Sequence, residues 1–168
     1  AALLILTYVA FEYSYDDIHT RQDRIFRVEA RFFENGELTD DWASSSAGYA
    51  TAMKQNMSGI EDYTRVGSQY YPEQVVKYNE LLYRETGIGY AEANFFNFFD
   101  FKLLKGNKEN CLDGPNKVVI TERIAHKYFK GENPIGKILI FRSNIGEEAC
   151  EVTGIMEDMP VNTHVRYS

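Results

Sequence analysis

The sequence has few cysteines, and those it has fit no familiar framework. Only two occur among its 168 residues, Cys111 and Cys150. Two cysteines cannot build the disulfide framework of a small secreted domain, and neither has the CxxC spacing or nearby histidine pair of a zinc site. The sequence leaves open whether they form one disulfide bond or remain two free thiols.

A hydrophobic run long enough to cross a membrane is also missing. The apolar stretch at the start, residues 1–11, carries one polar side chain, Thr7. It is shorter than the about 20 residues that a membrane-spanning helix needs. It also lacks the basic start and the small-residue cleavage site of a signal peptide. We interpret it as the trailing end of a longer apolar segment.

Positive charge is scarce as well. The chain has 18 Lys and Arg against 25 Asp and Glu, which gives a net charge of −7 and a pI near 5.0. Such a balance lacks the electrostatic attraction that nucleic acids and anionic lipid surfaces require, so we predict no nucleic-acid partner. Hydrophobic residues make up 44% of the chain and aromatic residues 14%, which predicts a packed core in one domain or two small lobes.

No catalytic or cofactor motif is present either. The segment Gly131–Lys137 resembles a phosphate-binding P-loop, but Ile138 stands where a Ser or Thr would hold magnesium. A predicted helix precedes these glycines and a predicted strand follows, so we expect a helix-to-strand turn. The three histidines, His19, His126 and His164, belong to no metal-binding or triad signature. We therefore predict no enzyme activity, no cofactor and no metal site.

The spacing of apolar residues predicts a helix at the start of the chain. Residues at intervals of three and four form one stripe: Leu4, Tyr8, Phe11, Tyr15 and Ile18. Polar residues keep the same spacing on a second stripe: Glu12, Asp16, His19 and Asp23. The pattern predicts an amphipathic helix over residues 1–23 that leaves a membrane, although an ordinary N-terminal core helix explains the stripe equally well.

Turn and cap signals divide the rest of the chain into short elements. Asn35-Gly36 predicts a β-hairpin, and Thr121 predicts the N-cap of a helix. Helices are predicted at residues 47–57, with an N-cap among Ser44 to Ser46, and at 93–99 and 122–129. Strands are predicted at residues 24–33, up to 42, and at 63–66, 75–78, 81–86, 101–104, 117–120, 138–142 and 149–156, with a hairpin around residues 144–146. Because strands and helices mix without regular alternation, we predict an α+β fold of mixed sheets, a few packing helices and two lobes, preceded by a membrane-proximal helix.

Phenylalanines crowd the segment between positions 95 and 101, at Phe95, Phe96, Phe98, Phe99 and Phe101. If exposed, they would form a contact patch for a lipid or a partner protein. Burying such side chains stabilises a fold by about 1.5 to 3 kcal/mol each, which favours a core. We predict that Phe95, Phe96 and Phe99 are mostly buried.

Several blocks, taken in their order, resemble one family. They are residues 8–16 (YVAFEYSYD), 18–19, 24–28 (RIFRV), 93–96 (ANFF), 99–106 (FDFKLLKG), 118–122 (VVITE), 134–137 (PIGK), 152–155 (VTGI) and 157–164 (EDMPVNTH). This series resembles the extracytoplasmic (periplasmic) core domain of MacB- and FtsX-like ABC transporter permeases, especially those of Bacteroides-type bacteria. Residues 33–89 match the family poorly.

The resemblance implies a non-catalytic domain between the first two transmembrane helices of an inner-membrane permease, facing the periplasm. A cytoplasmic ATPase subunit would hydrolyse ATP, and the domain, in a dimeric transporter, would couple that hydrolysis to export or mechanotransmission. Peptides, lipoproteins, toxins or drugs are the implied substrates. Residues 1–23 would end a transmembrane segment, and residues 24–168 would form the core domain, which in the family continues further. The first helix would act as a lever, and its candidate lever residues are Glu12, Tyr15, Asp16 and His19. The alternative is an extracytoplasmic ligand-binding or sensor domain of a membrane receptor, suggested by the tyrosine-rich residues 63–90.

Overall fold

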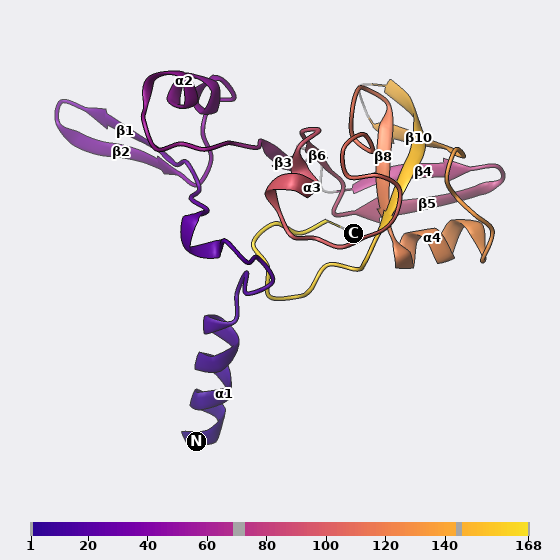
Figure 1. Ribbon diagram of the computed structural model, residues 1–168, viewed down its shortest axis with the longest axis horizontal. Helices are drawn as coiled ribbons and strands as arrows, with labels where there is room; N and C mark the ends of the chain where they lie inside the picture. The colour runs from indigo at the N-terminus through magenta and orange to yellow at the C-terminus, as the bar shows by residue number, and fades with distance from the viewer. Residues whose placement is uncertain (1, 69–72, 144–145, 168) are drawn as a thin grey trace.

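The chain folds into a projecting helix, a small lobe and a larger lobe (Figure 1). The computed structural model describes residues 2–68, 73–143 and 146–167. The small lobe contains a β-hairpin and helix α2, and the larger lobe contains a six-stranded sheet with helix α4 against it. The predicted α+β class, with mixed sheets and two lobes, is confirmed.

Helix α1 (Ala2–Tyr13) projects from the rest of the molecule and buries none of its residues (Figure 1). It ends ten residues before the predicted end at Asp23, so the second half of the predicted helix is wrong. The side-chain hydroxyl of Ser14 donates to the carbonyl of Phe11 at 2.7 Å, and Asp16 adopts a left-handed backbone with φ of 59°. Both features end an α-helix, since the first satisfies one of the last carbonyls and the second turns the chain away.

After α1 the chain makes turns and a short 3-10 helix, Gln22–Arg24. Among the described residues, no helix combines the length and the apolar character needed to cross a bilayer.

The small lobe begins with strands β1 (Ala30–Glu34) and β2 (Glu37–Trp42), which pair antiparallel. Asn35 and Gly36 form the predicted turn, with φ values of 51° and 86° that suit a two-residue hairpin loop. Helix α2 (Gly48–Asn56) follows, and its N-cap is Ala47, with no side-chain cap from the predicted serines. These elements contain no fully buried residue.

The larger lobe is built on one mixed sheet. Its strands are β4 (Glu73–Tyr78), β5 (Leu81–Thr86), β7 (Leu103–Lys105), β8 (Lys117–Thr121), β9 (Ile138–Ser143) and β10 (Gly146–Met156). Their order is β5-β4-β9-β10-β7, and β8 pairs parallel with β10. A separate pair, β3 (Val66–Ser68) and β6 (Gly89–Ala91), lies beside short helix α3 (Phe95–Phe98). Of the hairpin predicted around residues 144–146, positions 144 and 145 lie outside the described residues.

Helix α4 (Glu122–Phe129) covers one face of the sheet. Thr121 caps it as predicted, because its hydroxyl accepts from the amide of Ile124 at 3.4 Å. The buried residues of this first core come from α4 and four strands: Val76, Ile120, Ile124, Tyr128, Phe129, Leu139 and Val152. The P-loop look-alike is the expected turn, in which the amide of Gly136 donates to the carbonyl of Val152 at 2.8 Å.

A second core, here called the phenylalanine core, lies on the other face of the sheet. Along β8, Val118 packs with the first core and Val119 with the second, as alternation on a strand requires. The buried members of the phenylalanine core are Phe95, Phe96, Phe99, Phe101, Cys111 and Met156. Phe95, Phe96 and Phe99 are 2%, 2% and 7% exposed, so the prediction that they are buried is confirmed. Cys111 and Cys150 are both free thiols.

Replacing Phe95 tests whether the phenylalanine core stabilises the fold. Its ring lies 5.1 Å from that of Phe96 and 5.5 Å from that of Phe101. We expect Phe95→Ala to lower the free energy of unfolding by about 3 to 5 kcal/mol, because the truncation leaves a cavity. Urea denaturation followed by circular dichroism measures this. The matched control, Phe26→Ala, removes a ring that is 82% exposed and should change stability little; equal losses in both variants would contradict the assignment.

Candidate functional site

The segment that connects α1 to the lobes, residues 14–21, is here called the joint. Its first tie runs to the C-terminal segment, residues 157–167. The amide of Asp16 donates to the carbonyl of Asn162 at 2.9 Å. In return, the side-chain amide of Asn162 donates to the carbonyl of Ser14 at 2.7 Å and to its hydroxyl at 2.9 Å. Residues 148 positions apart along the chain are therefore held together where α1 ends.

The carboxylate of Asp16 completes this tie. Its Oδ1 accepts from the hydroxyl of Thr163 at 2.9 Å and from the amide of His164 at 3.0 Å, and its Oδ2 lies 2.6 Å from Nδ1 of His164. Burial alone would raise the pKa of Asp16, but the hydrogen bonds from His164 and Thr163 outweigh burial and lower it. Asp16 therefore remains charged at neutral pH and holds both residues of the C-terminal segment.

Tyr15 adds an aromatic contact to the same tie. Its ring lies 5.5 Å from that of Phe11 at the end of α1, in an edge-on arrangement, and 5.0 Å from the imidazole of His164. Tyr15 therefore bridges the last turn of α1 and the C-terminal segment.

The second tie of the joint runs to the phenylalanine core through His19. This side chain is 3% exposed and lies 5.2 Å from the ring of Phe99 and 5.0 Å from that of Phe101. Its Nδ1 accepts from the amide of Asp100 at 3.2 Å. Burial lowers the pKa of His19, against the opposing effect of the charges on Asp16 and Asp100. The imidazole is therefore held neutral, with its proton on Nε2.

Asp100 reinforces the second tie. Its Oδ2 accepts from the amide of Thr20 at 2.7 Å and from the hydroxyl of Thr20 at 2.9 Å. The hydrogen bond from the Thr20 amide is the main reason why the pKa of Asp100 is lowered. Arg21 adds a hydrogen bond to the carbonyl of Asn97 at 3.2 Å. The joint is thus fastened to the loop that carries the phenylalanine core.

Three of the four candidate lever residues gather in the joint: Tyr15, Asp16 and His19. The fourth, Glu12, is exposed on α1, and only its carbonyl reaches the joint, where it accepts from the amide of Tyr15 at 3.4 Å. The sequence analysis did not select the partners of the joint, which are Asp100, Asn162, Thr163 and His164. The signal that contained them was the resemblance, because its blocks 99–106 and 157–164 include all four positions.

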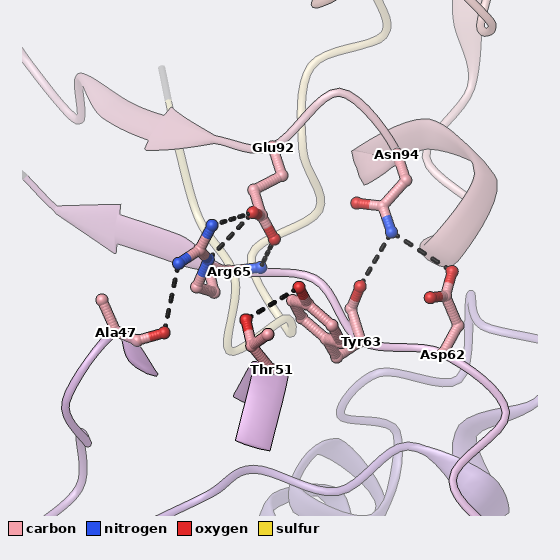
Figure 2. Close-up of polar contacts among 7 residues, drawn as sticks. All are labelled: Ala47, Thr51, Asp62, Tyr63, Arg65, Glu92 and Asn94. Carbon is pink, nitrogen blue, oxygen red and sulfur yellow. Dashed lines mark hydrogen bonds and ion pairs between the residues drawn. The ribbon is translucent and has the colours of Figure 1, made fainter. Parts of the chain in front are cut away.

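A separate set of polar contacts holds the small lobe to the larger one, and Figure 2 shows it. Arg65 donates from its amide and from Nε to the carboxylate of Glu92, both at 2.8 Å. Its Nη1 donates to the carbonyl of Ala47, just before α2, at 3.1 Å. We call this contact the lobe tie.

Neighbouring side chains extend the lobe tie on both sides (Figure 2). The hydroxyl groups of Thr51 on α2 and Tyr63 lie 3.0 Å apart. The side-chain amide of Asn94, just before α3, donates to the carbonyl of Tyr63 at 2.8 Å and to Asp62 at 3.2 Å. The position of α2 relative to α3 therefore depends on polar contacts.

Two open clefts of about 520 and 500 Å³ lie on the larger lobe. The first is lined by Thr86, Gly87, Arg123, Asp158, Met159, Arg166 and Tyr167, and the second by Glu73, Gln74, Val75, Leu82, Arg84, Arg142 and Ser143. Neither lining contains a histidine, cysteine or lysine. Within the described part of the chain, no group of three or more His, Cys, Asp or Glu side chains is placed to hold a metal ion.

Comparison with known proteins identifies the type of domain. The family described as MacB-like periplasmic core domain matches residues 1–166. None of the curated proteins compared with the chain matches it.

Solved structures share the fold of this chain. A domain of a protein described as a permease, from Porphyromonas gingivalis, is 25% identical, with a TM-score of 0.64 over 76% of this chain and 57% of that chain. The periplasmic region of MacB from Actinobacillus actinomycetemcomitans is 20% identical, with a TM-score of 0.53 over 68% of this chain and 50% of that chain. The extracellular domain of the ABC-type transporter YknZ from Gram-positive bacteria is 16% identical, with a TM-score of 0.51 over 71% of this chain and 60% of that chain.

The MacB and YknZ structures are only 20% and 16% identical to this chain, so their similarity shows the fold alone. The chain spans between 50% and 60% of the length of each of these three solved chains.

Neutralising Asp16 tests the first tie of the joint. Asn keeps the left-handed backbone accessible but removes the charge that His164 and Thr163 contact. We expect Asp16→Asn to lower the free energy of unfolding by about 1 to 2 kcal/mol at neutral pH. Because the folded pKa of Asp16 is lowered, the difference should begin to shrink as the pH falls below about 4, the ordinary pKa of an aspartate, and should vanish only below the lowered folded pKa, where the carboxyl of the original chain is itself protonated.

Thermal unfolding at several pH values measures this difference. Asp17→Asn is the matched control, since it makes the same chemical change at the next residue, which is exposed. A loss in Asp17→Asn as large as that in Asp16→Asn would contradict a specific role for Asp16.

Proposed function

The chain belongs to the MacB-like periplasmic core domain family, and on that premise we propose that it couples ATP hydrolysis in the cytoplasm to export or mechanotransmission outside the membrane. In this proposal the chain is the extracytoplasmic domain of an ABC transporter permease in the inner membrane, and it faces the periplasm. The observation that carries the proposal is the joint, because it connects an exposed apolar helix to the folded lobes by ties at two points.

The exposure of α1 supports a membrane-proximal position. Its large apolar side chains are open to solvent, among them Leu3 and Leu4 at 74% each. A helix of this kind is stable when lipid or other membrane helices surround it, since its apolar surface is then removed from water. The helix would then continue the membrane part of the permease, with its last turn at Tyr13 next to the joint.

The two ties of the joint support a role in transmitting movement. The first tie connects α1 to the C-terminal segment through Asp16, and the second connects it to the phenylalanine core through His19. The phenylalanine core lies against the sheet that also carries α4. A rotation of α1 would therefore move the larger lobe as a unit, since packed cores resist deformation.

We infer that the domain itself is not catalytic and uses no cofactor. The composition of the two clefts supports this, because histidine, cysteine and lysine are not among the residues that line them. Its partners would be the membrane helices of the permease, a cytoplasmic ATPase subunit, a second permease copy in a dimer, and a peptide, lipoprotein, toxin or drug as substrate.

A receptor or sensor role has less support. Of the tyrosines that suggested it, Tyr78 lies 4.5 Å from the ring of Phe129, and Tyr83 lies 5.4 Å from that of Tyr128. These tyrosines therefore pack against the first core. The tyrosines at positions 70 and 71 lie outside the described residues.

The coupling proposal is tested in the complete permease, reconstituted with its ATPase in lipid vesicles. Spin labels attached at His126→Cys on α4, an exposed position, report the distance between the two copies of the dimer. We expect this distance to change when ATP binds. In Asp16→Asn the change should become smaller while ATP hydrolysis continues, because the joint no longer transmits the movement of α1.

Asp17→Asn should behave like the original permease. A distance that does not respond to ATP in the original permease, or a change of full size in Asp16→Asn, would contradict coupling through the joint.

A further inference from the structure

We propose that the joint is an acid-sensitive connection, in which protonation of His19 releases the joint from the loop after α3 and leaves it tied to the C-terminal segment. This inference rests on the proposed function for its role, since a releasable joint matters only where α1 transmits movement. It concerns the regulation of that same site.

The hydrogen bonding of His19 fixes its protonation state. Because Nδ1 accepts from the amide of Asp100, that nitrogen must carry a lone pair. The proton of the neutral ring is then on Nε2, which is buried and has no hydrogen-bond partner among the described residues. A second proton could enter only at Nδ1, where it would face the N–H of Asp100 donor to donor.

The charged groups that face His19 are Asp16 and Asp100. Both would favour an imidazolium, but their carboxylates already accept hydrogen bonds elsewhere. Asp16 accepts from Thr163 and His164, and Asp100 accepts twice from Thr20. The rings of Phe99 and Phe101 also pack against His19. In this arrangement Nδ1 of His19 faces the donating amide of Asp100 and Nε2 has no hydrogen-bond partner in the described part of the chain, so a charged His19 is destabilised at this position and leaves it.

The two ties respond differently to acid. Protonation of His19 breaks the hydrogen bond with Asp100, and the neighbouring Thr20 contacts are lost when the joint moves away. The first tie rests on the Asp16 carboxylate, which accepts from the Thr163 hydroxyl at 2.9 Å and from the His164 amide at 3.0 Å, and its lowered pKa keeps it charged in mild acid. Acid therefore opens the tie to the phenylalanine core while the tie to the C-terminal segment holds.

The direction of the pH dependence follows from linkage. In the open joint His19 binds a proton with an ordinary pKa of about 6.5, and in the closed joint its pKa is lower. The closed joint is therefore fully stable above about pH 7 and loses stability as the pH falls from there through the lowered pKa. Asp16 and Asp100, whose pKa values are lowered from that of an ordinary aspartate, stay charged across this range.

Amide hydrogen exchange tests the proposal on the full chain in detergent micelles, which cover α1. The reporter amides are those of Asp100 and Thr20, which belong to the second tie, and that of Asp16, which belongs to the first. After correction for intrinsic exchange, the opening constant at Asp100 and Thr20 should rise between about pH 7.5 and about pH 5.5, by up to about tenfold. The opening constant at Asp16 should stay constant.

Two variants complete the design. His19→Asn places an amide oxygen where Nδ1 lies, so it keeps an acceptor for Asp100 without titrating, and its reporters should show no rise with acid. His126→Asn removes a histidine exposed on α4 and should keep the full rise. Any of three results would overturn the proposal: an opening constant that does not rise with acid in the original chain, an equal rise in His19→Asn, or an equal rise at the amide of Asp16.

A spectroscopic measurement covers the case in which His19→Asn does not fold. In the original chain, imidazole nitrogen shifts at neutral pH should show His19 as the Nε2–H tautomer. A His19 that is charged near pH 6.5, or that carries its proton on Nδ1, would overturn the proposal. Both measurements use the chain without its ATPase, so they are independent of the ATP-linked distance test. If the chain shows no acid response, the distance test can still succeed. If the distance test fails, the acid response can still be measured.

Discussion

The carboxylate of Asp16 is the group on which the position of α1 depends. It receives three hydrogen bonds from two residues at the far end of the sequence, and the backbone of Asp16 itself turns the chain out of the helix. In the lobe tie, Arg65 likewise donates hydrogen bonds to a carboxylate, that of Glu92, at the boundary between the small and the larger lobe. In both places, parts of the molecule meet through charged hydrogen bonds, and at the joint His19 also packs against the phenylalanine core. The hydrogen bonds themselves can rearrange without exposing a hydrophobic core to water.

The phenylalanine core has two roles that follow from its position. It fills the face of the sheet opposite α4, where β8 and β10 present alternate side chains to it. It also forms the apolar wall against which His19 packs. The same rings that stabilise the larger lobe therefore define the surroundings of the joint. A change in their packing would alter how far His19 is desolvated, and so the protonation of the joint depends on the core behind it.

Local signals in the sequence predicted the elements that local chemistry determines. Asn35-Gly36 forms its turn because both residues accept positive φ, and Thr121 caps α4 with its own hydroxyl. The burial of Phe95, Phe96 and Phe99 followed from their hydrophobicity. The predicted end of the first helix was wrong because apolar spacing continues through Tyr15 and Ile18, whereas the end is set by contacts of Asp16 with residues 147 and 148 positions away. Periodicity does not contain such contacts, so only the resemblance pointed to Asn162, Thr163 and His164.

The left-handed backbone of Asp16 explains why one residue can both end the helix and fasten it. That conformation costs on the order of 1 kcal/mol for a residue with a side chain, and Asp is among the few types that adopt it readily. A glycine would adopt it at no cost but would offer no carboxylate to Thr163 and His164, and a glutamate would carry its charge one methylene further out. An asparagine would accept the backbone and lose the charge. Aspartate alone therefore meets the steric and the electrostatic requirement at the point where α1 meets the folded lobes.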